Sequence, residues 1–351
     1  MTQGLAAVIL AAGEGTRMRS GLPKMLHPIA GLPMVSYPVR LSAGLGAKPV
    51  VLVVGCGAEA VLAAGKAAVG NGQAVIRSAL QTQRLGTAHA VMAGLEKLGR
   101  FRGRVLILYG DVPNLRPATV KRMLARARRR GEPLVLLTCR VPDPFGYGRV
   151  LRDEDGMPLR IVEEKDATAA ERQIDEINVG TYLVDAGLLR RGLVQVDDRN
   201  RKREFYLTDL VELARLEGAD VGAVVSEDPT EVAGINDRLQ LAQAEVRAQD
   251  ALLVKLMRSG VTLSDPATLH IDADVRVGRE TWLGPGVVLQ GKTRIGAGCC
   301  IDAHVVIRDS VVGRGAEIGA GAVLQGTRVA AGAVVGPLVH LPPGSRVRGR
   351  R

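Results

Sequence analysis

Aromatic side chains are scarce in this chain of 351 residues, which has three Phe and one Trp. Proteins that bind single-stranded nucleic acid need aromatic side chains interleaved with basic ones, because the bases stack on them. The formal net charge is +11, but the Arg residues are scattered apart from short runs at 126–130 and 346–351. We therefore interpret the charge as a solvated basic surface that attracts small anionic substrates, and we expect no nucleic-acid partner.

Cysteine and long hydrophobic runs are also lacking. None of the four cysteines forms a CxxC pair, so we interpret them as small buried residues or free thiols rather than as disulfides or zinc ligands: Cys56, Cys139, Cys299 and Cys300. The apolar run at 6–13 is too short for a secretory signal, and no later segment reaches the length that crosses a bilayer. We expect a cytoplasmic protein with no membrane partner.

Short apolar runs alternate with helix-like segments up to about residue 235. The runs are rich in Val, Ile and Leu, as expected for strands buried on both faces, and lie at 6–12, 49–55, 74–80, 104–111 and 133–141. The helix-like segments lie at 34–45, 57–69, 87–98 and 117–130. This alternation predicts the α/β class, with a mostly parallel, Rossmann-like sheet that binds its ligand at the carboxyl ends of the strands.

The pattern changes after residue 236. Residues 237–259 indicate a single connector helix that stops at Gly260. Apolar residues then recur every six positions, at Val277, Leu283, Leu289, Ile295, Ile301 and Ile307, and the series resumes after irregular steps at Val312, Ile318, Leu324, Val335, Leu341 and Val347.

A period of six is typical of a parallel β-helix, in which three short strands make a coil of about 18 residues. The span 265–347 allows about four such coils. The sequence therefore predicts a nucleotide-binding domain at 1–236, a connector helix at 237–260 and a short β-helix domain at 261–351.

The first apolar run leads into a glycine-rich loop. Met18 stands where a dinucleotide fingerprint needs its third glycine, and the loop has no Gly-Lys pair of the P-loop kind. Gly13 and Gly15 instead let backbone N–H groups approach the oxygens of a triphosphate. Arg17 and Lys24 would neutralise charge on the α-phosphate and on departing pyrophosphate. The alternative is a tight turn with two surface cations.

Another buried run, at 106–109, is followed by Gly110 and Asp111. A carboxylate at the carboxyl end of a strand suits Mg²⁺, which takes oxygen ligands from carboxylates, phosphates and water. The alternative is an Asp that only caps a turn or a helix.

The glycine-rich loop "LAAGEGTRMRSGLPKMLHPIAGLPM" resembles that of the sugar-phosphate nucleotidylyltransferases. More narrowly, the chain is similar to the uridylyltransferase half of the bifunctional N-acetylglucosamine-1-phosphate uridylyltransferase/glucosamine-1-phosphate acetyltransferase family. The resemblance continues in order through "LQTQRLGTAHAV", "LYGDVP", "DPFGYGRVLRDEDG", "IVEEKDATAAERQIDEINVGTYL", "EFYLTD" and "GINDRLQLAQAE". These seven blocks cover the whole first domain.

The resemblance implies a role for each matching residue. The nucleotide would be contacted by Leu10, Ala11, Ala12, Gly13 and Gly15, its phosphates by Lys24, and its uracil edge by Gln81, Gly86 and Thr87. Tyr109, Gly110 and Asp111 match the family's Tyr-Gly-Asp, and the amino sugar and ribose would be held by Gly146, Glu163 and Asn178. Asp111 and Asn236 would bind Mg²⁺.

The resemblance also implies the activity. The chain would transfer uridylate from UTP to N-acetylglucosamine 1-phosphate, with no general base, since the attacking phosphate oxygen is already ionised. Arg84 departs from the glutamine expected there, so a different sugar phosphate or dTTP stays an alternative, as does a non-catalytic subunit of this fold. His27 and His89 are interpreted as packing or capping groups.

For the second domain, the resemblance implies a left-handed β-helix that assembles as a homotrimer. The family's acetyltransferase site uses a His on later coils, and this chain ends at a segment that matches the region before it. Pro342 stands where a substrate-binding Arg is expected, and His340 is not in the catalytic position. We therefore expect acetyltransferase activity to be absent.

Overall fold

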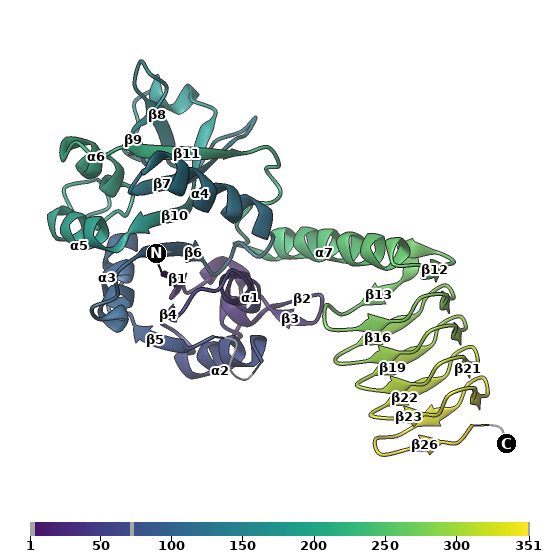
Figure 1. Ribbon diagram of the computed structural model, residues 1–351. Coiled ribbons are helices and arrows are strands. Elements are labelled where there is room, and N and C mark those ends of the chain that lie inside the picture. Colours follow the sequence, from purple (N-terminus) through teal and green to yellow (C-terminus); the bar gives the residue numbers. More distant parts are fainter. Residues whose placement is uncertain (1–3, 71–73, 350–351) are drawn as a thin grey trace. The chain divides into compact units, whose positions relative to one another are not determined.

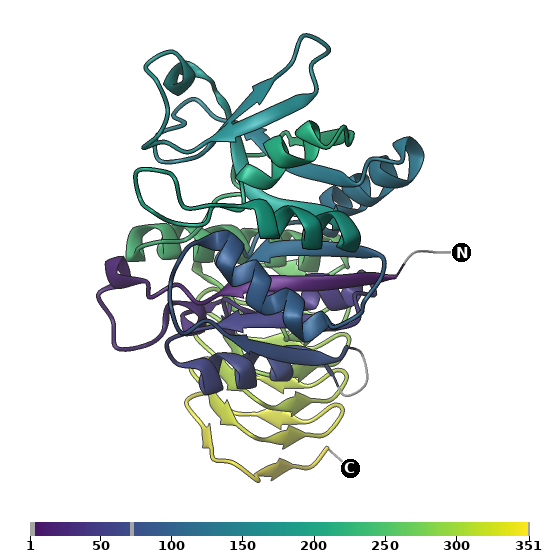
Figure 2. The same cartoon turned by 90° about the vertical axis from the view of Figure 1, so that its left-hand side faces the viewer.

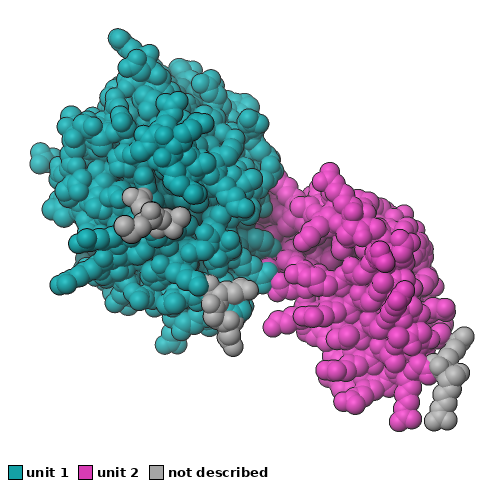
Figure 3. Space-filling view, in the orientation of Figure 1, with its two compact units in different colours: residues 1–27, 33–240 teal, residues 28–32, 241–351 magenta. Residues whose placement is uncertain are grey.

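The computed structural model describes residues 4–70 and 74–349. The chain divides into two compact units, one of residues 1–27 and 33–240 and one of residues 28–32 and 241–351 (Figure 3). The domain boundaries predicted from the sequence, at residues 236 and 260, concern which segments fold independently, and they stay a prediction. None of the described helices is long and apolar enough to cross a membrane.

A central sheet organises the first unit (Figure 1). Its main strands, in spatial order, are β11 (Val221–Ser226), β7 (Leu134–Arg140), β10 (Glu176–Asp185), β6 (Arg104–Tyr109), β1 (Leu5–Ala11), β4 (Val50–Val54) and β5 (Ile76–Leu80). Every residue of β4 is buried, as the continuous apolar run predicts for a strand covered on both faces. The five predicted strands are thus confirmed, and so is the mostly parallel sheet.

Two aliphatic cores lie on opposite faces of this sheet, because successive side chains of a strand point to opposite sides. One core packs against α3 (Thr87–Leu98), α5 (Ala186–Gln195) and α6 (Asp209–Leu216). The other packs against α1 (Ser36–Gly44), α2 (Ala58–Ala68) and α4 (Pro117–Arg130). The four helices predicted between the first strands are confirmed.

The antiparallel strand β10 is the main departure from the predicted pattern. It runs antiparallel to both β6 and β7 and carries the hairpin of β8 (Arg149–Arg152) and β9 (Pro158–Val162) at its edge. The remaining short elements are β2 (Pro28–Ile29), β3 (Leu32–Pro33) and the 3₁₀ turns Thr16–Met18, Lys24–Leu26, Glu171–Gln173 and Pro266–Thr268.

Helix α7 (Arg238–Arg258) lies where a single helix was predicted, and its residues from Leu241 on belong to the second unit. Its role as a connector between independent domains stays a prediction. The rest of that unit is a left-handed parallel β-helix whose rungs stack regularly (Figures 1 and 2). Leu283, Ile301 and Ile318 occupy successive rungs in register, and each is at most 1% exposed. Burying one such side chain stabilises the folded state by roughly 1.5–3 kcal/mol.

Three parallel sheets of five strands form the walls of the β-helix. They consist of β12 (Thr262–Leu263), β15 (Trp282–Leu283), β18 (Cys300–Ile301), β21 (Glu317–Ile318) and β24 (Val334–Val335); of β13 (His270–Ile271), β16 (Val288–Gln290), β19 (Val306–Arg308), β22 (Val323–Gln325) and β25 (His340–Leu341); and of β14 (Arg276–Val277), β17 (Arg294–Ile295), β20 (Val311–Val312), β23 (Arg328–Val329) and β26 (Arg346–Val347).

The predicted count of about four coils is wrong, because each described sheet has five strands and the first rung already begins at Thr262. The irregular steps of the repeat are also explained. Val312 and Val329 each lie five residues after the preceding inward-facing residue, Ile307 and Leu324, and still pair in register with each other. All four cysteines are free thiols.

Candidate active site

The glycine-rich loop after β1 bends over the carboxyl end of the sheet. Gly15 adopts a left-handed conformation, with φ of 64°, and a Cβ atom there would lie 2.5 Å from the Cβ of Lys24. A side chain at position 15 would therefore be strained and would also push Lys24 aside. Arg17 follows at once in a short 3₁₀ turn, so one tight loop carries both predicted phosphate-binding cations.

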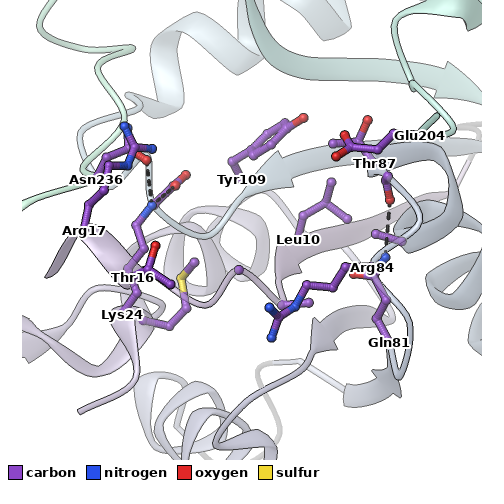
Figure 4. Close-up of a pocket in the computed structure, with 17 residues that line it drawn as sticks. Leu10, Thr16, Arg17, Lys24, Gln81, Arg84, Thr87, Tyr109, Glu204 and Asn236 are labelled. Atoms are coloured by element: carbon purple, nitrogen blue, oxygen red, sulfur yellow. Dashed lines mark hydrogen bonds and ion pairs between the residues drawn. The ribbon is translucent and has the colours of Figure 1, made fainter. Parts of the chain in front are cut away.

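The first cavity has a volume of about 360 Å³ and lies between this loop, β6 and the start of α3 (Figure 4). It brings together residues that are far apart in the sequence. The predicted residues that line it are Leu10, Ala12, Gly13, Gly15, Arg17, Lys24, Gln81, Gly86, Thr87, Tyr109, Asp111 and Asn236.

Lys24 is held between two oxygen atoms at the inner end of this cavity. Its Nζ atom donates to Asp111 Oδ2 at 2.5 Å and to Asn236 Oδ1 at 3.0 Å, and its side chain is only 7% exposed. The two oxygens therefore converge on one positively charged atom. A carboxylate and an amide oxygen arranged in this way are suitable donors for a small divalent cation.

The backbone fixes Asp111 and Asn236 beside each other. Asp111 follows β6 at the carboxyl end of the strand, and its carbonyl accepts a hydrogen bond from Ile235 N at 3.0 Å. Asn236 N donates to Gln240 Oε1 at 2.6 Å, which joins the loop to the start of α7 within the first unit. Two segments distant in sequence are thus tied together at the site.

The opposite end of the first cavity is built around the start of α3. Gly86 has φ of 118°, and a Cβ atom there would lie 2.4 Å from the carbonyl oxygen of Phe205, so only glycine fits this approach. Gln81 Nε2 lies 3.3 Å from Gly86 O and 3.3 Å from His89 Nδ1. These contacts hold the Gln81 amide beside the cavity, where its polar atoms suit the edge of a base.

The second cavity, of about 230 Å³, adjoins the first. Its lining contains Gly146, Glu163 and Asn178, the residues predicted to hold the sugar and ribose. Three residues line both cavities: Tyr109, Asp111 and Asn236. A molecule in each cavity would therefore meet the other at this shared wall.

Glu163 is an acidic residue that lines the second cavity and not the first. Its Oε1 atom accepts a hydrogen bond from the Thr208 hydroxyl at 3.3 Å. Burial raises the pKa of the Glu163 carboxyl, and the Thr208 hydrogen bond partly opposes this by favouring the ionised form. A buried carboxylate and the Asn178 amide can together bind several hydroxyl groups, as expected for a sugar site.

Two predicted site residues line neither cavity. Ala11 points into the core on the α1, α2 and α4 face, because its neighbours Leu10 and Ala12 take the opposite face of β1. Gly110 lies behind the cavity wall, where its N–H donates to Leu10 O at 2.8 Å. Neither His27 nor His89 belongs to the lining of either cavity.

Several lining residues carried no sequence signal. Glu204 reaches the first cavity from a loop that packs on the start of α3, where Phe205 N donates to Leu85 O and Leu207 N to the Thr87 hydroxyl oxygen. Glu204 is the first residue of the block "EFYLTD", which carries part of the family resemblance, but no motif in the sequence indicated a function for this side chain. The others in the first cavity are Thr16, Met25 and Ala90, and Tyr147 is the main addition to the second. Arg84, which the sequence analysis singled out as a departure from the expected glutamine, also lines the first cavity.

Asp209, the first residue of α6, gives a test of the electrostatics around Glu163. Burial, and after it the nearby acidic groups, chiefly Asp197 and Glu163, together raise the pKa of its carboxyl to about 7. Because the folded pKa exceeds the unfolded value, the stability present at low pH is lost as pH rises from about 4 to about 7. We expect Asp209→Asn to be more stable than the wild type above pH 7, by about 1 kcal/mol after allowance for solvent screening.

Urea unfolding of both proteins at pH 4.5, 6 and 8 measures this difference. It is expected to be smallest at pH 4.5 and to grow toward pH 8. A stability difference that stays constant over this range would show that Asp209 is ionised throughout.

Comparison with known proteins supports the two-part architecture. Residues 7–165 match the MobA-like NTP transferase domain family, and residues 274–309 match the bacterial transferase hexapeptide (six repeats) family. The bifunctional protein GlmU of Anaeromyxobacter sp. (strain Fw109-5) is 47% identical over 98% of this chain and 69% of its own length. That of Trichlorobacter lovleyi is 45% identical over 97% of this chain and 73% of its own length.

Among solved structures, UDP-glucose pyrophosphorylase complexed with UDP-glucose superposes with a TM-score of 0.56. The match covers 73% of this chain and all of that chain, at 16% sequence identity. At this identity the likeness shows a shared fold only.

Proposed function

The chain belongs to the GlmU family of nucleotidyltransferases, and we propose that it transfers the uridylyl group of UTP to N-acetylglucosamine 1-phosphate. The products are UDP-N-acetylglucosamine and pyrophosphate. The observation that carries the proposal is the pair of adjoining cavities that share Tyr109, Asp111 and Asn236. A reaction between two bound substrates needs their reacting atoms side by side, and the shared wall is where two occupants would meet.

The charges of the first cavity suit a triphosphate. Arg17 and Lys24 line it next to the glycine-rich loop, so they oppose the negative charge that develops on the α-phosphate and on departing pyrophosphate. The attacking oxygen belongs to a phosphate that is ionised near neutral pH, so no side chain has to remove a proton. The protein's work is then alignment and charge neutralisation.

Mg²⁺ is the metal that we propose for this site, with Asp111 and Asn236 as its protein ligands. The fit rests on the convergence of Asp111 Oδ2 and Asn236 Oδ1 on the Lys24 ammonium, a cation in the same place. When bound there, the metal would neutralise phosphate charge. The described residues include no cluster of three or more His, Cys, Asp or Glu side chains for a metal, so phosphate oxygens and water would complete the coordination.

A second candidate function keeps this chemistry and changes the substrate, to another sugar 1-phosphate or to dTTP. The observation that favours it is Arg84, which lines the first cavity where the family resemblance predicts glutamine. A non-catalytic subunit is disfavoured, because Lys24, Asp111 and Asn236 form one connected cluster.

A substrate panel tests both versions. Pyrophosphate release is measured with UTP, dTTP, CTP and ATP, each paired with N-acetylglucosamine 1-phosphate, glucosamine 1-phosphate and glucose 1-phosphate. We expect the highest kcat/KM for UTP with N-acetylglucosamine 1-phosphate. A higher value for another pair would establish the second candidate, and no turnover of any pair by folded protein would reject both.

For the second unit we propose two properties. The first is that these 351 residues have no acetyltransferase activity, because Pro342 stands where the family resemblance expects a substrate-binding Arg and His340 is not in the catalytic position. Acetyl-CoA consumption in the presence of glucosamine 1-phosphate would contradict this.

The second property is a homotrimer formed through the β-helix. The proposal follows from the family resemblance and from the match of residues 274–309 to the bacterial transferase hexapeptide family. Light scattering at micromolar concentration is expected to give three times the chain mass, and a monomer would contradict the proposal.

A further inference from the structure

Arg84 and Glu14 form an ion pair at the mouth of the first cavity. Glu14 stands between Gly13 and Gly15 in the glycine-rich loop, and Arg84 lies in the connection between β5 and α3. The pair joins Arg84 Nη1 to Glu14 Oε1, so it links the glycine-rich loop to the connection between β5 and α3. Figure 4 shows Arg84 among the residues that line the cavity. The uridylyl-transfer mechanism proposed above uses neither residue.

A carboxylate in this position needs an explanation. The loop around it has the features of a triphosphate site, and a negative charge beside phosphate oxygens weakens their binding. Arg84 neutralises Glu14 in the structure, and it is also a cavity-lining residue with five N–H donors. A guanidinium placed here can bind either the Glu14 carboxylate or a phosphate.

We propose that Arg84 is a further phosphate-binding residue of the nucleotide site, and that Glu14 is its exchangeable counter-ion. This inference rests on the proposed function. When the triphosphate occupies the cavity, the guanidinium leaves Glu14 and takes phosphate oxygens, with which it forms two parallel charge-assisted hydrogen bonds. Glu14 then turns to solvent. In the empty site, the ion pair keeps Arg84 close to the position of the phosphates.

Exposure of the pair makes this exchange possible. The side chains of Arg84 and Glu14 are 41% and 54% exposed, and ion pairs in water-accessible positions are held by only about 0–1 kcal/mol. The pair of Lys24 and Asp111 differs, because its side chains are only 7% and 18% exposed. Breaking that pair without a replacement partner would be far more costly.

The position of the pair favours phosphate over base. Arg84 pairs with a residue of the glycine-rich loop, which has the features of a phosphate site. The groups suited to a base edge have other partners, since Gln81 contacts Gly86 and His89. Arginine also offers donors only, so it matches an anion that offers acceptors only. Uracil presents both donors and acceptors at its edge.

Two substitutions of opposite expected sign test the proposal. Arg84→Gln is expected to weaken binding of pyrophosphate, in the presence of Mg²⁺, by about fivefold, since one charge-assisted contact is lost. Glu14→Gln is expected to tighten it by about twofold, because Arg84 loses the competing carboxylate. Isothermal titration with pyrophosphate measures both, and uridine, which has no phosphate, is expected to bind equally to all three proteins.

Arg19→Gln is the matched control, since Arg19 lies in the glycine-rich loop that carries Glu14, is exposed and does not line the cavity. It removes one positive charge and is expected to change pyrophosphate binding by less than about 1.5-fold at 0.15 M salt. In steady-state kinetics, Arg84→Gln is expected to raise KM for the nucleotide and to leave KM for the sugar phosphate unchanged.

Two results would overturn the proposal. If Arg84→Gln and Glu14→Gln weaken pyrophosphate binding alike, the pair is only a structural link between the loops. If Arg84→Gln changes uridine binding and not pyrophosphate binding, Arg84 reads the base. A failure of the proposed function is distinguishable, because it appears as absent turnover in the wild type while the binding titrations remain measurable.

Discussion

Lys24→Met is expected to lower kcat/KM for pyrophosphate release by about 10²–10³-fold. Lys24 is the mostly buried cation at the wall between the two cavities, where it contacts both Asp111 and Asn236. Methionine has nearly the same length and shape but no charge, so the loss reports on the ammonium group. The measurement is a steady-state assay with both substrates varied.

The same substitution leaves Asp111 without its ionic partner. We therefore expect Lys24→Met to unfold at lower urea concentration in the absence of Mg²⁺, with a loss of about 3 kcal/mol. Lys121→Met, on the exposed face of α4, is the matched control and is expected to change neither quantity. Activity of Lys24→Met within about threefold of the wild type would contradict the role assigned to the ammonium group.

Asp111→Asn is expected to lower kcat/KM by about 10³-fold or more. The substitution keeps the shape of the side chain but removes its charge, and among the described residues Asp111 is the only carboxylate that lines both cavities. Metal affinity gives a readout besides activity. Mn²⁺ binding followed by electron paramagnetic resonance is expected to weaken at least about tenfold, since an amide oxygen is a poorer ligand than a carboxylate.

Asp155→Asn, on the exposed turn between β8 and β9, is the control for this substitution. Because Asp111→Asn also leaves Lys24 unpaired, its stability is compared with that of the double variant with Lys24→Met. The double variant is expected to lose less stability than the two single losses added together. Unchanged Mn²⁺ binding by Asp111→Asn would contradict the metal assignment.

Much of the fold was predictable because buried side chains are apolar and recur at spacings that depend on the secondary structure. The run at 50–54 is apolar throughout, since β4 is covered on both faces, and it was predicted as a strand for this reason. The six-residue spacing from Leu283 to Ile307 predicted the β-helix, because inward-facing side chains must recur once per strand. Where a corner loses one residue, as before Val312, the period slips but the stacking continues.

The direction of a buried strand, parallel or antiparallel, does not change the spacing of its apolar residues. Residues 176–185 are buried almost throughout whether the strand runs parallel or antiparallel, so β10 could not be oriented from its composition. The membership of residues 28–32 in the second unit was also invisible. Two hydrogen bonds join this segment to the rest of the unit, from Ala30 N to Glu245 Oε2 and from Ala273 N to Ala30 O.

The candidate site was predictable in its residue types and not in its geometry. The positions of Lys24, Asp111 and Asn236 were proposed from motifs and family resemblance, whereas the contact between Lys24 and Asn236 spans 212 positions in sequence. Glu204 is a further example, because an isolated Glu in a loop has no pattern that separates a cavity-lining residue from a solvated one. The ion pair of Glu14 with Arg84 likewise had no signal in the sequence. Only the packing of loops against each other decides this.

The central claim is that two substrates react across the shared wall of the two cavities. It is tested most directly by ³¹P nuclear magnetic resonance of the protein with UTP, N-acetylglucosamine 1-phosphate and Mg²⁺. We expect UDP-N-acetylglucosamine and pyrophosphate in equal amounts, and neither product when one substrate is omitted. Unchanged UTP in the presence of folded protein, or UMP and pyrophosphate formed without the sugar phosphate, would contradict it.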